Sequence, residues 1–329
     1  WVVVRNVVQR GSEDVTLGSF LLDLKIERVS VDGNGNLSVS VKRNPGEGNL
    51  TAINFIVSDG KNSQIIKKET SLAELEQKVF VISQSELGEL GFAKKVEIVP
   101  VLITGKKEKM GNVADEQEFT TKQILQNLGA VSWWGLDGNA KDEVGSNDGT
   151  EYGGVNCNAN GKFGKACEFD GINDYVNTGN DASLNFADNG IFSIALWVKP
   201  KTLVSSWKRG IVVQESYLVS GYRFGFNNGG APRFWTTQSG GTLTVTSSDI
   251  LNVNQWNYIV VTYNNLQSYI YLNGKRTGNG TGSYKAGTNI LSTGASVSEY
   301  FNGTIDELMI FNKTLTENQV NSLYNLNLN

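Results

Sequence analysis

The sequence predicts an all-β protein made of two antiparallel sandwiches, a small immunoglobulin-like one followed by a larger one. Short segments that alternate apolar and polar residues recur along the chain, separated by turn sequences rich in Asp, Asn and Gly. A length of 329 residues exceeds what one hydrophobic core usually supports. Of the 62 charged residues, 33 lie in the first 125 positions and 29 in the remaining 204, so composition places the boundary near residue 125.

The first part predicts hairpins. The segments "FLLDLKIERVSV" and "LSVSVKR" alternate on either side of "DGNGN", and "TAINFIVSDGKNSQIIKKE" repeats this design with Asp59 and Gly60 at its turn. A further strand is expected in "KKVEIVPVLITG", and a helix over 71–79, with Ser71 as N-cap and Glu74 at the capping-box position. Strands about ten residues apart are typical of a small immunoglobulin-like sandwich.

The second part predicts more strands of the same kind, and short helices flank it. "TTKQILQNLGA" precedes the strands, and "TLTENQVNSLYN" follows them, with Thr316 as its expected N-cap. The expected strands are "FSIALWVKP", "GYRFGFNN", "PRFWTT", "LTVTSS", "QWNYIVVTY", "SYIYLNGKR" and "GTIDELMIFN".

Composition excludes several function classes. The chain has no histidine, which removes the usual general base and the commonest zinc ligand. A net charge of -4 without a basic run disfavours nucleic acid as a partner. The two cysteines, Cys157 and Cys167, flank a glycine-rich turn, and this spacing predicts one local disulfide and an oxidising, extracellular location.

Five motifs stand in a fixed order in the second part. They are "VSWWGLDGNAKDEVGSNDGT", "GKFGKACEFDGINDYVNTG", "FSIALWVKP", "QWNYIVVTY" with "IYLNGK", and "FNGTIDELMIFNKTLTENQVNSLY". This series resembles a laminin-G-like domain of the concanavalin A-like jelly-roll superfamily over about residues 127–329. The resemblance implies two large antiparallel sheets, a terminal helix, and binding of glycans or protein partners on secreted and surface proteins.

The beginning of the chain carries a second resemblance. Trp1, Val4, Val7 and Val8 fall at helical spacing, and with the strands that follow they resemble archaeal pilin-like surface proteins. That likeness implies membrane or filament attachment through an N-terminal helix, and the alternative is a short amphipathic lead-in helix. The expected organisation is the end of a hydrophobic helix at 1–12, a small sandwich at 13–120, a linker at 121–130 and the jelly roll at 131–329.

The superfamily resemblance also implies one calcium ion, because jelly rolls of this kind often hold a metal where their first and last strands meet. Its ligands would be Asp170 or the Gly171 carbonyl, together with Asp306 and Asp137. The alternative is structural: the "FDGIND" residues serve a turn, while Phe169 and Tyr175 face the core.

Aromatic residues beside arginines form the candidate ligand site. Trp197 and Trp256 lie within apolar alternation and are expected in the core. Aromatic rings and planar polar groups are the ingredients of sugar recognition. The candidates, with Arg233 nearby, are Trp207, Arg209, Tyr222, Arg223 and Trp235.

Hydrolysis is the least expected function, because laminarinase-type relatives carry an E-x-D-x-E-like run that 127–329 lacks. Asp306 and Glu307 are adjacent, so strand geometry predicts that they point to opposite faces. The sequence therefore predicts a non-enzymatic adhesion protein, at the cell surface or secreted, with a glycan-binding domain. The alternative is a structural filament or coat subunit with a protein-binding jelly roll.

Overall fold

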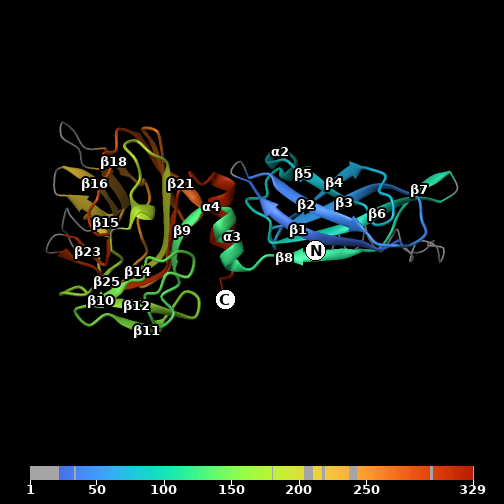
Figure 1. Cartoon of the computed structure of the whole chain (residues 1–329). Coiled ribbons are helices and arrows are strands. Elements are labelled where there is room, and N and C mark those ends of the chain that lie inside the picture. Colours follow the sequence, from blue (N-terminus) through green and yellow to red (C-terminus); the bar gives the residue numbers. More distant parts are fainter. Residues whose placement is uncertain are drawn as a thin grey trace. The chain divides into compact units, whose positions relative to one another are not determined.

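The computed structural model divides the chain into two compact units, residues 1–127 and 128–329 (Figure 1). The structure describes residues 22–32, 35–104, 106–179, 181–203, 210–216, 219–236, 243–296 and 299–328.

Unit 1 contains two antiparallel sheets. The first has the order β1-β2-β5, and the second has the order β4-β3-β6-β7, with β8 also paired to β6. The strands are β1 (Leu24–Val31), β2 (Leu37–Arg43), β3 (Leu50–Ser58), β4 (Ser63–Glu69), β5 (Gln77–Ile82), β6 (Lys95–Thr104), β7 (Lys107–Met110) and β8 (Asp115–Glu118).

The two sheets of unit 1 pack face to face as the sequence predicts. Val39 and Val41 alternate inward on β2 and are fully buried. Phe55 of β3 and Phe80 of β5 belong to different sheets, yet their ring centroids lie 5.2 Å apart. Their contact spans the interior of a small sandwich.

The predicted helix over 71–79 is wrong. Residues 73–76 form a turn and β5 begins at Gln77. Arg43 holds the turn from both ends, since its guanidinium donates to the Leu72 carbonyl at 2.7 Å and its own carbonyl accepts from the Leu75 N–H. Tertiary pairing with β2 therefore overrides local helix propensity. The helix that does form, α2 (Gln84–Leu87), is capped by Ser83.

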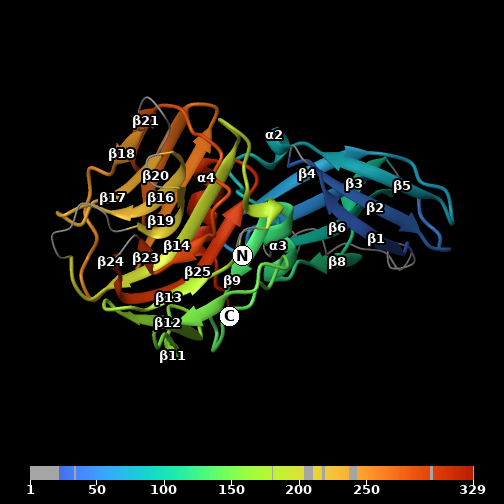
Figure 2. The same ribbon diagram turned by 60° about the vertical axis from the view of Figure 1, so that its left-hand side comes forward.

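Unit 2 consists of two larger antiparallel sheets that form two layers (Figure 2). Every strand predicted in this part is confirmed. The eight-stranded sheet has the order β11 (Asn156–Asn160), β12 (Lys165–Asp170), β25 (Asn302–Phe311), β14 (Phe192–Pro200), β19 (Asn257–Asn264), β20 (Gln267–Leu272), β21 (Lys275–Thr281), with β9 (Ala130–Trp134) also paired to β25.

The seven-stranded sheet has the order β10 (Thr150–Tyr152), β13 (Tyr175–Asn177), β22 (Ser292–Thr293), β15 (Gly210–Ser216), β16 (Ser220–Phe226), β17 (Pro232–Thr236), β18 (Thr244–Thr246). A two-stranded ribbon of β23 (Ala295–Ser296) and β24 (Glu299–Tyr300) accompanies it.

Two helices confirm the flanking predictions. α3 (Thr121–Asn127) precedes β9, and α4 (Glu317–Asn325) begins at the Thr316 cap, whose side chain accepts from the Gln319 N–H. α4 lies on the side of the eight-stranded sheet that faces away from the other sheet (Figure 1). There Tyr324 stacks on Trp197 with ring centroids 5.5 Å apart.

None of the described helices is long and apolar enough to cross a membrane. The predicted N-terminal helix at 1–12 lies outside the described residues. Attachment through that segment stays a prediction.

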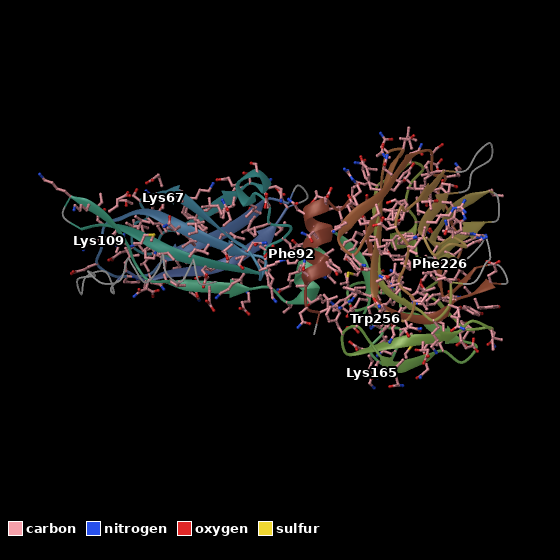
Figure 3. All side chains as sticks on the ribbon, turned by 180° about the vertical axis from the view of Figure 1, so that it is seen from behind. Lys67, Phe92, Lys109, Lys165, Phe226 and Trp256 are labelled. Atoms are coloured by element: carbon pink, nitrogen blue, oxygen red, sulfur yellow. A yellow bond between two sulfur atoms is a disulfide. The ribbon has the colours of Figure 1, made fainter. Side chains whose placement is uncertain are left out.

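An aromatic cluster fills the space between the two sheets of unit 2. Phe192 of β14 is fully buried at its centre, stacked on Phe186, Tyr222 and Tyr263 with ring centroids 4.7 to 5.4 Å apart. Phe226, labelled in Figure 3, belongs to the same core. Offset aromatic contacts of this kind add stability beyond the burial of area.

Phe192→Ala should lower the free energy of unfolding of unit 2 by about 3–5 kcal/mol, because it leaves a cavity that rigid rings cannot fill. Urea unfolding followed by tryptophan fluorescence measures this, since six of the seven tryptophans lie in unit 2 and only Trp1 precedes it. Tyr152→Ala, at a site 42% exposed, is the matched control and should cost far less. Equal losses would contradict the central role of Phe192.

Candidate functional site

The predicted ligand residues separate onto the two faces of the seven-stranded sheet. Tyr222 is fully buried and stacks on Phe192, so its ring belongs to the core and its predicted ligand role is wrong. Burial raises the pKa of the Tyr222 phenol well above its ordinary value. The cause is the period of two along β16, in which Tyr222, Phe224 and Phe226 all point inward. Trp207 and Arg209 lie outside the described residues.

Arg223 and Trp235 lie on the opposite, outer face. They are direct cross-strand partners on β16 and β17, while their neighbours Phe224 and Phe234 form the inner pair. Arg223 is only 3% exposed, and burial lowers the pKa of its guanidinium although the charge of Glu299 partly offsets this. Arg223 thus lies on the outer face of the sheet but is almost completely shielded from solvent.

The exposed end of this face is formed by β17 and β18, and we call Arg233, Trp235, Thr244 and Thr246 the Trp235 face. Trp235 pairs with Thr244, and Arg233 pairs with Thr246. Both threonines are exposed, and both β17 residues are half-buried. The Arg233 guanidinium carbon lies 5.3 Å from the centroid of the Trp235 ring. A cation, a large ring and two hydroxyls therefore share one surface.

A second aromatic pair lies on the outer face of the same sheet, and sequence reasoning missed it. Tyr152 and Tyr175 are cross-strand partners whose rings stack 4.7 Å apart at 9°. The prediction that Tyr175 faces the core is wrong, because its neighbour Val176 is the buried residue. Phe169, by contrast, is fully buried as predicted. A turn at 171–174 separates Phe169 from the β13 strand, so the alternation does not continue between them.

Of the two tryptophans predicted for the core, Trp197 is buried as expected and Trp256 is not. Trp197 is 3% exposed, but it lies under α4 on the outer face of the eight-stranded sheet and not between the sheets. Trp256, labelled in Figure 3, is only half-buried, with the Lys199 ammonium 5.8 Å from its ring centroid.

Of the four residues predicted as calcium ligands, Asp306 and Asp137 lie near each other, whereas Asp170 and Gly171 lie apart from Asp306. Asp170 pairs with Asn302 on β25, whereas Asp306 lies four residues further along that strand, roughly 13 Å away. The Asp170 carboxylate accepts the Ile172 N–H at 2.7 Å, and Gly171 has a φ of +80° that favours glycine. The Asp170 carboxylate thus serves the turn, and calcium binding stays a prediction. Among the described residues, no group of three Asp, Glu, Cys or His side chains is arranged to hold a metal ion.

Asp306 and Asp137 instead hold the turn between β11 and β12. The Asp306 Oδ2 atom accepts the N–H groups of Lys162 and Phe163 at 2.7 and 3.1 Å. Asp137 Oδ1 accepts the Lys165 N–H from the other end of the turn at 2.5 Å. The predicted disulfide is confirmed nearby, where Cys157 of β11 and Cys167 of β12 are joined.

A β-bulge places Asp306 and Glu307 on the same face, so the prediction of opposite faces is wrong. Ile305 and Leu308 both point into the inter-sheet core, which leaves the two acids between them on the outer face. Glu307 has a φ of 53°, and its carboxylate accepts the Trp133 indole N–H at 2.5 Å. Both acids are essentially buried, at 0% and 1% exposure.

Burial shifts the titration of both acids. It raises the pKa of Asp306 to about 7, against backbone hydrogen bonds from Phe163, Lys162 and Glu307 that favour the charged form. Burial, with the neighbouring charge of Asp306, raises the pKa of Glu307 to about 9. Asp137 adds repulsion to both acids and Glu143 adds it to Glu307. The pair therefore binds protons more strongly in the folded than in the unfolded chain.

This proton uptake predicts that unit 2 loses stability as pH rises. Asp306 and Glu307 are protonated in both the folded and the unfolded chain well below pH 4. As pH rises, the two acids ionise first in the unfolded chain, so the free energy of unfolding falls until pH reaches their folded pKa values of about 7 and 9. Glu307→Gln keeps an acceptor for Trp133 and should abolish most of the loss between pH 7 and 9. Urea unfolding at both pH values measures it.

Asp188→Asn is the control. Lys285 and the Ala286 N–H lower the pKa of Asp188, so its contribution is lost only in acid and stays constant from pH 7 to 9. A wild-type slope that persists in Glu307→Gln would show that Glu307 is not the group responsible.

Comparison with known proteins agrees with this architecture. Residues 170–321 match the family model described as the concanavalin A-like lectin/glucanases superfamily, laminin G type. No curated protein matches the chain. Domain 4 of AbnA, an extracellular GH43 arabinanase of Geobacillus stearothermophilus solved with arabinotriose, is 21% identical, with a TM-score of 0.52 over 60% of this chain and 98% of that one.

Two further structures are less similar. The binding domain of botulinum neurotoxin DC in complex with SialylT is 16% identical, with a TM-score of 0.49 over 61% of this chain. A Trypanosoma rangeli sialidase is 10% identical, with a TM-score of 0.45 over 90% of this chain. The matched region spans 52% of each of these chains.

The two facing sheets, together with the family model matched over residues 170–321, identify unit 2 as a concanavalin A-like jelly roll. Within that superfamily it is a laminin-G-like domain, as the five ordered motifs predict.

Proposed function

We propose that unit 2 is a glycan-binding module that acts outside the cell or on its surface. The observation that carries the proposal is the Trp235 face, where a half-buried indole lies beside a guanidinium on an otherwise polar surface. Pyranose rings stack their C–H faces on aromatic side chains, while hydroxyls meet planar polar groups. Thr244 and Thr246 supply hydroxyls on the adjacent strand.

The position of Trp235 supports binding to a rigid surface. β17 is held between β16 and β18, and Phe234 anchors it in the aromatic core with full burial. The ring therefore needs little ordering when a ligand arrives, which lowers the entropic cost of association. Domain 4 of AbnA shares the fold and was solved with a trisaccharide, which agrees with a sugar ligand.

The buried acid pair supports binding without hydrolysis. Glycosidases place two carboxyl groups on either side of the bond that they cleave. Asp306 and Glu307 are together but enclosed, and their oxygens accept hydrogen bonds from Lys162, Phe163 and Trp133. A substrate has no access to them, so their role is to fix the turn and the bulge.

The disulfide supports an extracellular location, because such bonds persist in oxidising compartments. Unit 1 is then the carrier that displays the binding domain. One stacking ring with a few hydrogen bonds corresponds to dissociation constants of roughly micromolar to millimolar, so adhesion would need many copies.

Trp235→Ala should weaken glycan binding by about 10-fold or more, because stacking is lost while the fold remains. A glycan array followed by calorimetry measures this on the full chain. Trp256→Ala is the matched control, since Trp256 also lies beside a cation but next to β19 in the other sheet. It should bind as the wild type does.

Other outcomes of the array would overturn the proposal. No bound sugar would favour a protein-binding or structural role for the domain. Release of reducing sugar would instead show a hydrolase.

A further inference from the structure

We infer that the glycan recognised at the Trp235 face carries a carboxylate, as a uronic or sialic acid residue does. This inference rests on the proposed function and adds the chemical class of the ligand. It comes from the charges around Arg233, which differ from those around Arg223, the other arginine described on this sheet.

Arg233 has a ring neighbour but no acidic partner among the described side chains. Its contact is with Trp235, and its Nε–H is buried without a hydrogen-bond acceptor in the described part of the chain. A buried donor left unpaired costs free energy, so an acceptor near this guanidinium would be stabilising. Arg233 as a whole is only half-buried, so a carboxylate can approach its guanidinium from the solvent side and form charge-assisted hydrogen bonds there.

The neighbouring arginine does not compete for the same ligand. Arg223 lies opposite Trp235 and diagonal to Arg233, but it is buried and the charge of Glu299 acts on it. The described side chains of the face thus leave one positive charge at Arg233 without an opposing one.

The net charge of the chain indicates that an anionic ligand would be bound through short-range contacts at Arg233. The chain carries a net charge of -4, so long-range electrostatics repel anionic glycans in general. Recognition must therefore come from short-range contacts. In these contacts the sugar ring stacks on the Trp235 indole, and the carboxylate of the sugar pairs with the Arg233 guanidinium. The required ligand is a pyranose whose carboxylate lies at the edge of the stacked face.

The test compares matched glycans that differ in one charged group. Lactose is paired with sialyllactose, a glucose-terminated oligosaccharide with its glucuronate-terminated analogue, and each neutral member with a sulfated form. Wild type should bind the carboxylated members more tightly than the neutral ones. Arg233→Gln should lose about 10- to 100-fold on the carboxylated members and almost nothing on the neutral ones, since a charge-assisted pair is removed.

Two further variants keep the result specific. Arg233→Lys retains the charge but loses the planar fork, so it should recover only part of the affinity. Lys199→Gln, which removes the cation beside Trp256, should leave binding unchanged. The unfolding midpoint of each variant confirms that it is folded.

The outcomes separate the inference from the function on which it rests. If neutral and carboxylated glycans bind equally and Arg233→Gln changes neither, the inference is overturned while glycan binding stands. If only sulfated members bind, the carboxylate assignment is also wrong. If no glycan binds at all, the proposed function fails and the inference fails with it.

Discussion

The structure of unit 2 depends on strand β25, which is covered on both faces. One face meets the aromatic core between the sheets. The other face contacts the β11–β12 turn and the Trp133 side chain. A strand buried on both sides leaves no solvent for its polar groups, so Asp306 must satisfy backbone N–H groups and Glu307 an indole. The raised pKa values of both acids follow from this enclosure.

The seven-stranded sheet is under a weaker constraint at its β17–β18 end. Its inner face must fill the core, which fixes Phe224 and Phe234. Its outer face there carries exposed threonines together with the half-buried Arg233 and Trp235. Side chains on that face are covered less completely than those of the core, so a tryptophan beside an arginine can stay partly exposed at little cost to the fold. A sheet whose inner face is held rigidly by the core and whose outer face is partly exposed can position side chains for ligand binding.

The sequence predicted the fold well and the site only in part. Alternation of apolar and polar residues marks strands directly, so β14, β16 and β25 were found, as was the Thr316 cap of α4. The sequence could not show which face of a strand is covered. Alternation divides the residues of a strand between its two faces, but it does not show what each face packs against. Tyr222 and Trp235 therefore looked alike in the sequence, although only Trp235 has an exposed surface.

What the sequence determined by itself was local: strand identity, turn chemistry, the Cys157–Cys167 pair and the absence of histidine chemistry. The tertiary structure alone decided the register and its irregularities. It separated Asp170 from Asp306, brought Asp306 and Glu307 to one face through an extra residue in β25, and converted 71–79 from a helical pattern into a turn and a strand. Register depends on pairing between segments far apart in the chain, and no local pattern contains that information.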